Sequence, residues 1–100
     1  MRILHWNCGS LKDRKAEAEK LAYTADIVCL QETQRQVIKP RDFQPPVCND
    51  LGHGQLICLR NGIRFKSLDL TRWASDNLHL CGVEQIDQPV RNVISVYAVF

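Results

Sequence analysis

The sequence has no long apolar run, and its longest apolar stretches are only a few residues. A transmembrane helix needs about 20 consecutive apolar residues, so we expect no membrane contact. Residues 1–7 (MRILHWN) also lack the apolar core of a secretory signal peptide.

The cysteine pattern lacks a Cys-x-x-Cys pair, and the number of cysteines, five, is odd. These features argue against the usual zinc and disulfide patterns. We therefore expect free thiols and a reducing, intracellular compartment, nuclear or cytoplasmic. Three cysteines stand within apolar runs and are expected to be buried: Cys29, Cys58 and Cys81.

Net charge is also small, at +2, from 13 basic and 11 acidic residues. That balance permits a nucleic-acid partner without arguing for one. The basic residues of the second half are expected to form a solvated face, with phosphate contact as the alternative: Arg60, Arg64, Lys66 and Arg72. One hundred residues leave room for a single domain.

The first third of the chain predicts a strand, a helix and a buried strand. Residues 2–6 are expected to form the first strand. Ser10 begins a capping-box pattern, which predicts that Ser10 caps a helix running to about Thr24. Residues 27–30 are continuously apolar, as in a strand buried on both faces. This order of elements predicts an α/β fold.

The rest of the chain predicts a loop followed by strand pairs. Residues 39–54 are rich in proline, glycine and asparagine, which predicts a loop. Asn61-Gly62 is the sequence typical of a type I′ hairpin turn. The expected strands are residues 55–60, 63–66, 78–86 and 92–99, with residues 87–89 as a turn between the last two.

Polar side chains follow the first two expected strands. Asn7 follows residues 2–6, and Glu32 comes just after residues 27–30. If these strands are parallel neighbours, both side chains lie at the carboxyl edge of the sheet, where open α/β sheets bind ligands. Glu32 can then hold Mg²⁺, and Asn7 can orient a phosphate oxygen. The alternative is that Glu32 is a solvated acid and Asn7 only forms a turn.

Several segments together resemble the endonuclease/exonuclease/phosphatase family. ILHWN followed by CGSL, and DIVCLQET, are similar to its two N-terminal signatures. This family includes DNase I, exonuclease III, the apurinic/apyrimidinic endonucleases and the endonuclease domains of LINE-type non-LTR retrotransposons. Gly52-His53-Gly54 before LICLR, then RNGIRF and NVISVYAVF, resemble later elements in the same order. The resemblance therefore covers the whole chain.

The resemblance implies a fold and an activity. Residues 1–100 would be the N-terminal part of a DNase I-like α/β sandwich, two packed β-sheets with outer helices, and the C-terminal half of the domain would be its partner. The activity would be Mg²⁺-dependent, or Mn²⁺-dependent, cleavage of phosphodiester bonds in nucleic acid, above all DNA. By position, Asn7 and Tyr97 match catalytic residues, and Glu32 matches the metal ligand.

Two features depart from the family pattern. Gly9 stands where some nucleases carry an aspartate, and Ala98 follows Tyr97 where many members have a proline turn. The family's later signatures, which include its aspartate–histidine pair, do not occur in residues 1–100. We therefore expect the isolated chain to be inactive. The alternatives are a non-catalytic relic or interaction module of the same fold, or a family member acting on lipid or inositol phosphates.

Overall fold

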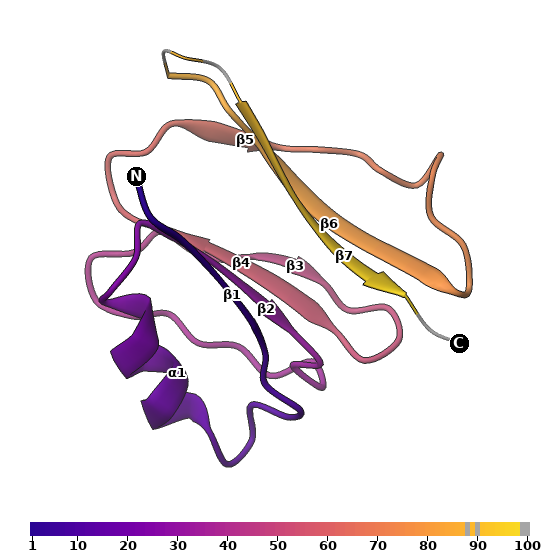
Figure 1. Ribbon diagram of the computed structural model, residues 1–100, viewed down its shortest axis with the longest axis horizontal. Coiled ribbons are helices and arrows are strands. Elements are labelled where there is room, and N and C mark those ends of the chain that lie inside the picture. The colour runs from indigo at the N-terminus through magenta and orange to yellow at the C-terminus, as the bar shows by residue number, and fades with distance from the viewer. Residues whose placement is uncertain (88, 90, 99–100) are drawn as a thin grey trace.

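The computed structural model describes residues 1–87, 89 and 91–98, which form seven strands and one short helix (Figure 1). The elements in order are β1 (Ile3–Asn7), α1 (Lys15–Ala22), β2 (Ile27–Gln31), β3 (Val47–Asn49), β4 (Gln55–Leu59), β5 (Phe65–Ser67), β6 (Leu78–Gln85) and β7 (Arg91–Ala98). The predicted α/β class is confirmed at this level, with strands predominating.

The first sheet contains four strands in the order β1-β2-β4-β3. β1 and β2 are parallel, and α1 connects them. The other pairs are antiparallel. Parallel neighbours need such a crossover because the chain must return to the same end of the sheet before the second strand begins, which a tight turn cannot do. The predicted strand–helix–strand opening is therefore confirmed.

The second sheet contains three antiparallel strands in the order β5-β6-β7, and it packs face to face with the first sheet (Figure 1). Apolar side chains of both sheets fill the space between them: Ile27, Cys29, Ile57, Leu59, Cys81, Val83 and Val93. The alternate residues of β2 and β4 point to the other face, where α1 packs. Strand periodicity thus divides one sheet's side chains between two cores.

The thiols behave as expected from their apolar neighbours. All five cysteines are free. Cys29, Cys58 and Cys81 are buried, as predicted, and Cys8 is buried as well. Cys48 on β3 is exposed.

The predicted helix start at Ser10 is wrong. α1 begins at Lys15, and its N-cap residue Arg14 makes no side-chain capping bond. Ser10 Oγ instead accepts a hydrogen bond from the Lys12 N–H, 3.4 Å away. A turn closed by the Arg14 N–H and the Leu11 carbonyl, 3.0 Å apart, occupies the intervening residues. This turn lets Leu11 be completely buried in the helix-side core.

The predicted hairpin at Asn61-Gly62 is also wrong. A type I′ turn needs positive φ at both central residues, but only Gly62 has it, at 93°. The turn is closed by the Ile63 N–H and the Arg60 carbonyl, 3.3 Å apart. β5 then pairs with β6 rather than with β4, so the chain passes from the first sheet to the second.

Two smaller expectations are corrected. The loop predicted over residues 39–54 contains β3, which pairs with β4. Arg60 does not belong to a solvated face: its guanidinium donates to the carbonyls of Ala25 and Tyr23, at 2.9 and 3.0 Å, and lies over the Phe43 ring. The expected turn and final strand include Gln88 and Val99, which lie outside the described residues.

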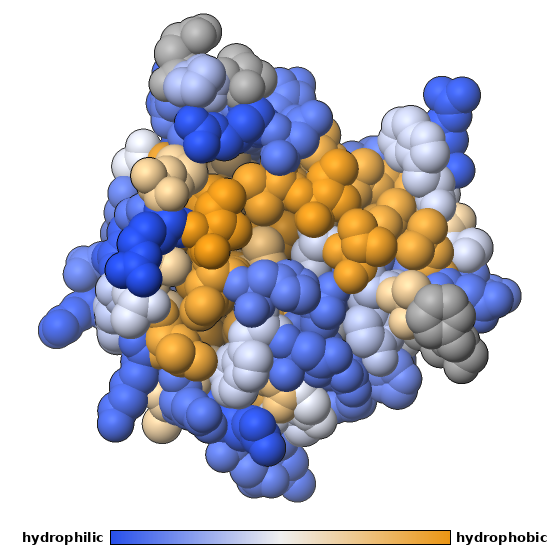
Figure 2. Space-filling model, in the orientation of Figure 1, coloured by the Kyte–Doolittle hydropathy of each residue, from blue (hydrophilic) through white to orange (hydrophobic). Residues whose placement is uncertain are grey.

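Apolar side chains remain exposed at the sheet edges. Figure 2 shows an apolar band on the face viewed in Figure 1. The exposed apolar residues include Ile3 on β1, and Ile94 and Val96 on β7. β1 and β7 are the end strands of their sheets. The helix α1 is too short to cross a membrane, and the described residues contain no other candidate span.

Candidate functional site

Asn7 and Glu32 lie side by side at the carboxyl ends of β1 and β2. Asn7 is in register with Gln31, the residue before Glu32. The next residue, Cys8, donates its N–H to the Gln31 carbonyl at 3.0 Å, and its thiol lies 3.6 Å from the Glu32 carbonyl oxygen. The predicted juxtaposition is confirmed, because parallel strands end at the same sheet edge.

The Asn7 side chain combines a turn with a free donor. Its Oδ1 accepts a hydrogen bond from the Gly9 N–H at 3.2 Å, so Asn7 does form a local turn. Gly9 has a φ of 68°, a conformation that favours glycine. The exposed Nδ2 group has no hydrogen-bond partner within the described part of the chain. Asn7 can therefore both shape the turn and donate to an anionic ligand.

Tyr97 reaches the same end of the molecule through the second sheet. Gln31 projects between the sheets, and its Nε2 donates to the Ser95 hydroxyl at 3.4 Å and to the Val96 carbonyl. These two residues directly precede Tyr97 on β7. Glu32 directly follows Gln31, and Tyr97 directly follows Val96, so this contact brings Glu32 and Tyr97 to the same end of the sandwich. We call this end of the sandwich, with Asn7, Glu32 and Tyr97, the rim.

Buried amides hold the two sheets together beneath the rim. Gln55 on β4, the register partner of Gln31, donates to the Ser95 carbonyl at 3.0 Å. Asn49 Nδ2 donates to Gln55 Oε1 at 3.1 Å and to the Leu80 carbonyl at 3.0 Å. Gln31, Gln55 and Ser95 are nearly fully buried. Sequence reasoning missed this network, although alternation along residues 27–31 and 55–59 places both glutamines on the inward face.

Two histidines that sequence reasoning did not assign to the site flank Tyr97. The ring centroids of His53 and Tyr97 are 5.9 Å apart, edge to face, and those of His79 and Tyr97 are 6.2 Å apart. His53 Nδ1 lies 3.3 Å from Gln34 Nε2. His79 packs over Gly52, where a Cβ would lie 2.1 Å from its Cε1. The signal that could have placed His79 at the site is its position opposite Tyr97 in the pairing of β6 with β7.

The backbone after β2 is strained. Glu32, Gln34 and Arg35 have φ values of 56°, 54° and 63°, in the left-handed region that side chains disfavour. Gly54 makes room for this segment, since a Cβ there would lie 2.4 Å from Thr33 Oγ1. Strain of this kind costs about 1–3 kcal/mol per residue and concentrates at functional sites.

The rim supplies oxygen ligands but few carboxylates. Among residues 1–87, 89 and 91–98, no three His, Cys, Asp or Glu side chains come together as a metal site. Mg²⁺ is often held by one or two carboxylates, with water and substrate phosphate completing its shell. Glu32 can therefore supply one ligand to Mg²⁺, and the described residues alone do not supply the remaining protein ligands of an enclosed site.

The pKa of the Cys8 thiol is affected by its burial and by the nearby charge of Glu32. Burial raises the pKa of the Cys8 thiol, and the nearby Glu32 charge raises it further, whereas Arg14 and backbone hydrogen bonds oppose the rise. A thiol that stays protonated is a poor nucleophile. Cys8 is buried in the helix-side core and packs beside Glu32.

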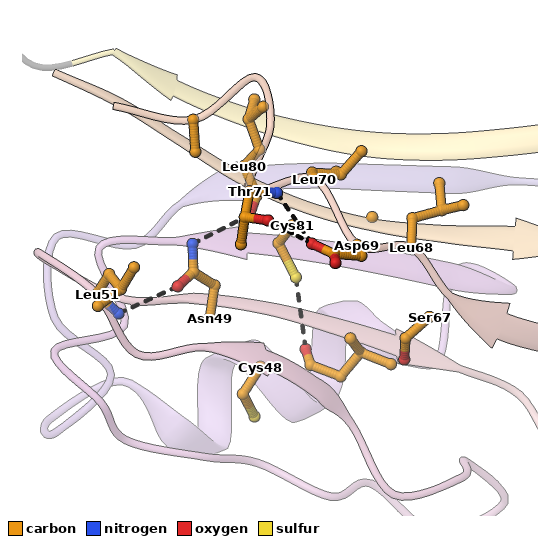
Figure 3. A pocket seen from close by; sticks show the side chains of 13 residues that line it. Cys48, Asn49, Leu51, Ser67, Leu68, Asp69, Leu70, Thr71, Leu80 and Cys81 are labelled. Atoms are coloured by element: carbon orange, nitrogen blue, oxygen red, sulfur yellow. Dashed lines mark hydrogen bonds between the residues drawn. The ribbon is translucent and has the colours of Figure 1, made fainter. Parts of the chain in front are cut away.

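A cavity of about 290 Å³ lies elsewhere, beside β3 at the sheet edge opposite β1 (Figure 3). Three of its polar side chains, Asn49, Asp69 and Thr71, bond within the protein. Asp69 accepts hydrogen bonds from the Thr71 N–H and hydroxyl, at 3.1 and 2.7 Å, and Asn49 bonds to the Leu80 carbonyl. Most of its lining is apolar, and Asn7, Glu32 and Tyr97 are not among its lining residues.

Comparison of the sequence with models of known protein families, and with the sequences of curated proteins, found no match.

Proposed function

We propose that the chain is the N-terminal part of a Mg²⁺-dependent phosphodiesterase of the endonuclease/exonuclease/phosphatase type that cleaves nucleic acid. One observation carries this proposal: Asn7 ends β1, Glu32 directly follows the parallel neighbour β2, and Tyr97 lies at the same rim. The three residues are those that the resemblance assigns to catalysis and metal binding. If the resemblance were accidental, there would be no reason for Glu32 and Tyr97, which are 65 positions apart in sequence, to lie at the same rim.

Glu32, Asn7 and Tyr97 would each make a different contact with a bound metal ion and phosphodiester. A bound Mg²⁺ would supply positive charge that stabilises the reacting phosphate. Glu32 provides a carboxylate for it. The free Nδ2 of Asn7 donates to a phosphate oxygen, and the Tyr97 hydroxyl provides a second donor. Holding the phosphate in one orientation lowers the barrier because less freedom is lost at the transition state.

A second candidate is a non-catalytic interaction module of the same fold. β7 has β6 as its neighbour on one side only, and Ile94 and Val96 are exposed on it. An unpaired apolar edge strand is a template for pairing with another chain. On this alternative the rim residues are structural and no metal binds at Glu32.

Manganese titration followed by NMR distinguishes the metal-dependent phosphodiesterase from the interaction module. Mn²⁺ broadens resonances of nuclei close to it, so even weak binding is localised. In the wild-type chain, we expect Mn²⁺ to broaden the Asn7 side-chain amide and the Tyr97 ring before other signals. Glu32→Gln should remove this selective broadening. Glu84→Gln, which changes a β6 carboxylate near Lys66, should leave it unchanged.

Uniform broadening in the wild-type chain contradicts the proposal and favours the interaction module. Selective broadening that persists in Glu32→Gln contradicts the assignment of Glu32. The circular dichroism spectra of both variants provide the control for folding.

A further inference from the structure

Arg35 and His53 lie on two loops that backbone hydrogen bonds join directly after Glu32. The segment after β2 is bonded to the loop before β4: the Gln34 N–H donates to the His53 carbonyl at 2.7 Å, and the Thr33 N–H donates to the Gly54 carbonyl at 3.3 Å. Arg35 and His53 therefore belong to one structural unit with Glu32.

The Arg35 guanidinium is anchored and still has free donors. Its Nε donates to the Asp50 carbonyl at 3.1 Å. Arg35 is exposed and makes no ion pair with the described residues. Its two terminal nitrogens are thus available, and the planar guanidinium suits bidentate binding of phosphate.

His53 is anchored in a comparable way. Gln34 Nε2 contacts its Nδ1, and the Tyr97 ring packs against it. His53 is exposed, and the glycines on either side of it leave the approach open. Its Nε2 therefore remains available to a ligand at the rim.

Three other basic residues of the described chain, Arg60, Arg64 and Lys66, are engaged with acids or carbonyls. Lys66 pairs with Glu84 at 3.7 Å, and Arg64 pairs with Asp87 at 3.9 Å. Arg60 binds backbone carbonyls of the helix-side loop. Arg35 differs from the other lysines and arginines that the structure describes because its backbone has a positive φ of 63°, and its guanidinium is fixed to the Asp50 carbonyl without an ion pair.

We propose that Arg35 and His53 form a second phosphate-binding subsite, next to the phosphate position at Glu32 and Asn7. The ligand is a neighbouring phosphate of the same polynucleotide. This inference rests on the proposed function only for the phosphate at Glu32. Two adjacent phosphate positions fit an internal phosphodiester of a nucleic-acid strand, so the subsite favours an endonuclease over an enzyme for isolated phosphate esters.

The test is the salt dependence of oligonucleotide binding. Fluorescence anisotropy would follow a labelled single-stranded oligothymidylate in EDTA, between low and moderate salt. Each phosphate neutralised contributes about 0.7 to the slope of log K against log salt concentration for single strands. We expect Arg35→Gln to reduce the slope by about 0.7 and to weaken binding several-fold. His53→Gln should weaken binding several-fold.

Matched variants separate the subsite from general charge and from folding. Arg64→Gln removes the same charge on the second sheet and should leave the slope unchanged. Arg35→Lys should keep the slope. Arg35→Gly removes the side chain at a positive φ that glycine adopts freely, so it should reproduce Arg35→Gln without a folding defect.

Three results would overturn the subsite: no oligonucleotide binding by the wild-type chain at low salt, equal slopes for Arg35→Gln and Arg64→Gln, or tighter binding of inositol hexakisphosphate than of the oligonucleotide. The last result favours a non-nucleic phosphate ester. Because EDTA removes metal, the slopes do not depend on Glu32. The subsite and the metal proposal can therefore fail separately.

Discussion

The Gln31 side chain on β2 donates a hydrogen bond to the Ser95 hydroxyl on β7, across the space between the two sheets and 64 residues away in sequence. Both side chains are nearly fully buried. Buried polar groups are costly unless they are paired, so this contact determines how the sheets align at the rim. It thereby sets the position of Tyr97 relative to Glu32.

Replacing Gln31 with methionine should lower the free energy of unfolding by about 1–3 kcal/mol. Methionine has a similar length but cannot donate to Ser95 or to the Val96 carbonyl. Urea denaturation measures the change. Gln36→Met is the matched control at a less buried glutamine and should change stability by less than about 0.5 kcal/mol. Equal effects of the two substitutions would show that the inter-sheet contact is unimportant.

Gly52→Ala should destabilise the chain more than Gly62→Ala. Both glycines have positive φ, 58° and 93°, so both substitutions carry the left-handed penalty of about 1–2 kcal/mol. At Gly52 the added Cβ also meets the His79 ring at 2.1 Å, whereas at Gly62 it meets nothing within 4 Å. Thermal denaturation compares the two. A smaller effect at Gly52 would contradict the packing of His79.

Thiol labelling at neutral pH should modify Cys48 rapidly and Cys29, Cys58 and Cys81 slowly. Cys48 is exposed and the other three are buried. Mass spectrometry of the native chain after brief treatment with a maleimide identifies the modified residues. Complete labelling in denaturant is the control. Rapid modification of Cys29 in the native chain would contradict the observed packing.

The same thiols should make stability fall at alkaline pH. Burial raises the pKa of Cys29 to about 11 and those of Cys58 and Cys81 to about 12, from an ordinary value of 9.0. Above about pH 9 the unfolded thiols ionise while the folded ones stay protonated, so rising pH favours unfolding. The loss reaches up to about 1.4 kcal/mol per pH unit for each thiol. Cys81→Ala should show a shallower decline in urea titrations between pH 9 and 11; an unchanged decline counts against this.

The isolated chain should not nick supercoiled plasmid above background with Mg²⁺ or Mn²⁺. Glu32 is the single carboxylate assigned to the metal, and Mg²⁺ held by one carboxylate binds weakly. No described histidine at the rim has a carboxylate partner to orient it as a base. Gel electrophoresis of plasmid incubated with purified chain measures nicking. Nicking that is lost in Glu32→Ala would disprove this prediction.

Local sequence patterns predicted six of the seven strands that the structure describes and three of the four buried thiols. β2 follows from an uninterrupted apolar run, and the β1–α1–β2 order follows from its turn and helix patterns. These features depend on neighbours within a few residues, so local periodicity predicts them. Asn7 and Glu32 also share an edge for a local reason, since each ends one of two adjacent parallel strands.

Contacts between distant segments depend instead on tertiary packing. Asn61-Gly62 has a local preference for a hairpin, but β5 pairs with β6, because that pairing places Phe65 on the inter-sheet core. Ser10 has a local preference for capping, but burial of Leu11 delays the helix to Lys15. A local preference is worth about 1 kcal/mol, and burying an apolar side chain contributes more, about 1.5–3 kcal/mol. Packing therefore overrides the local signal wherever the two disagree.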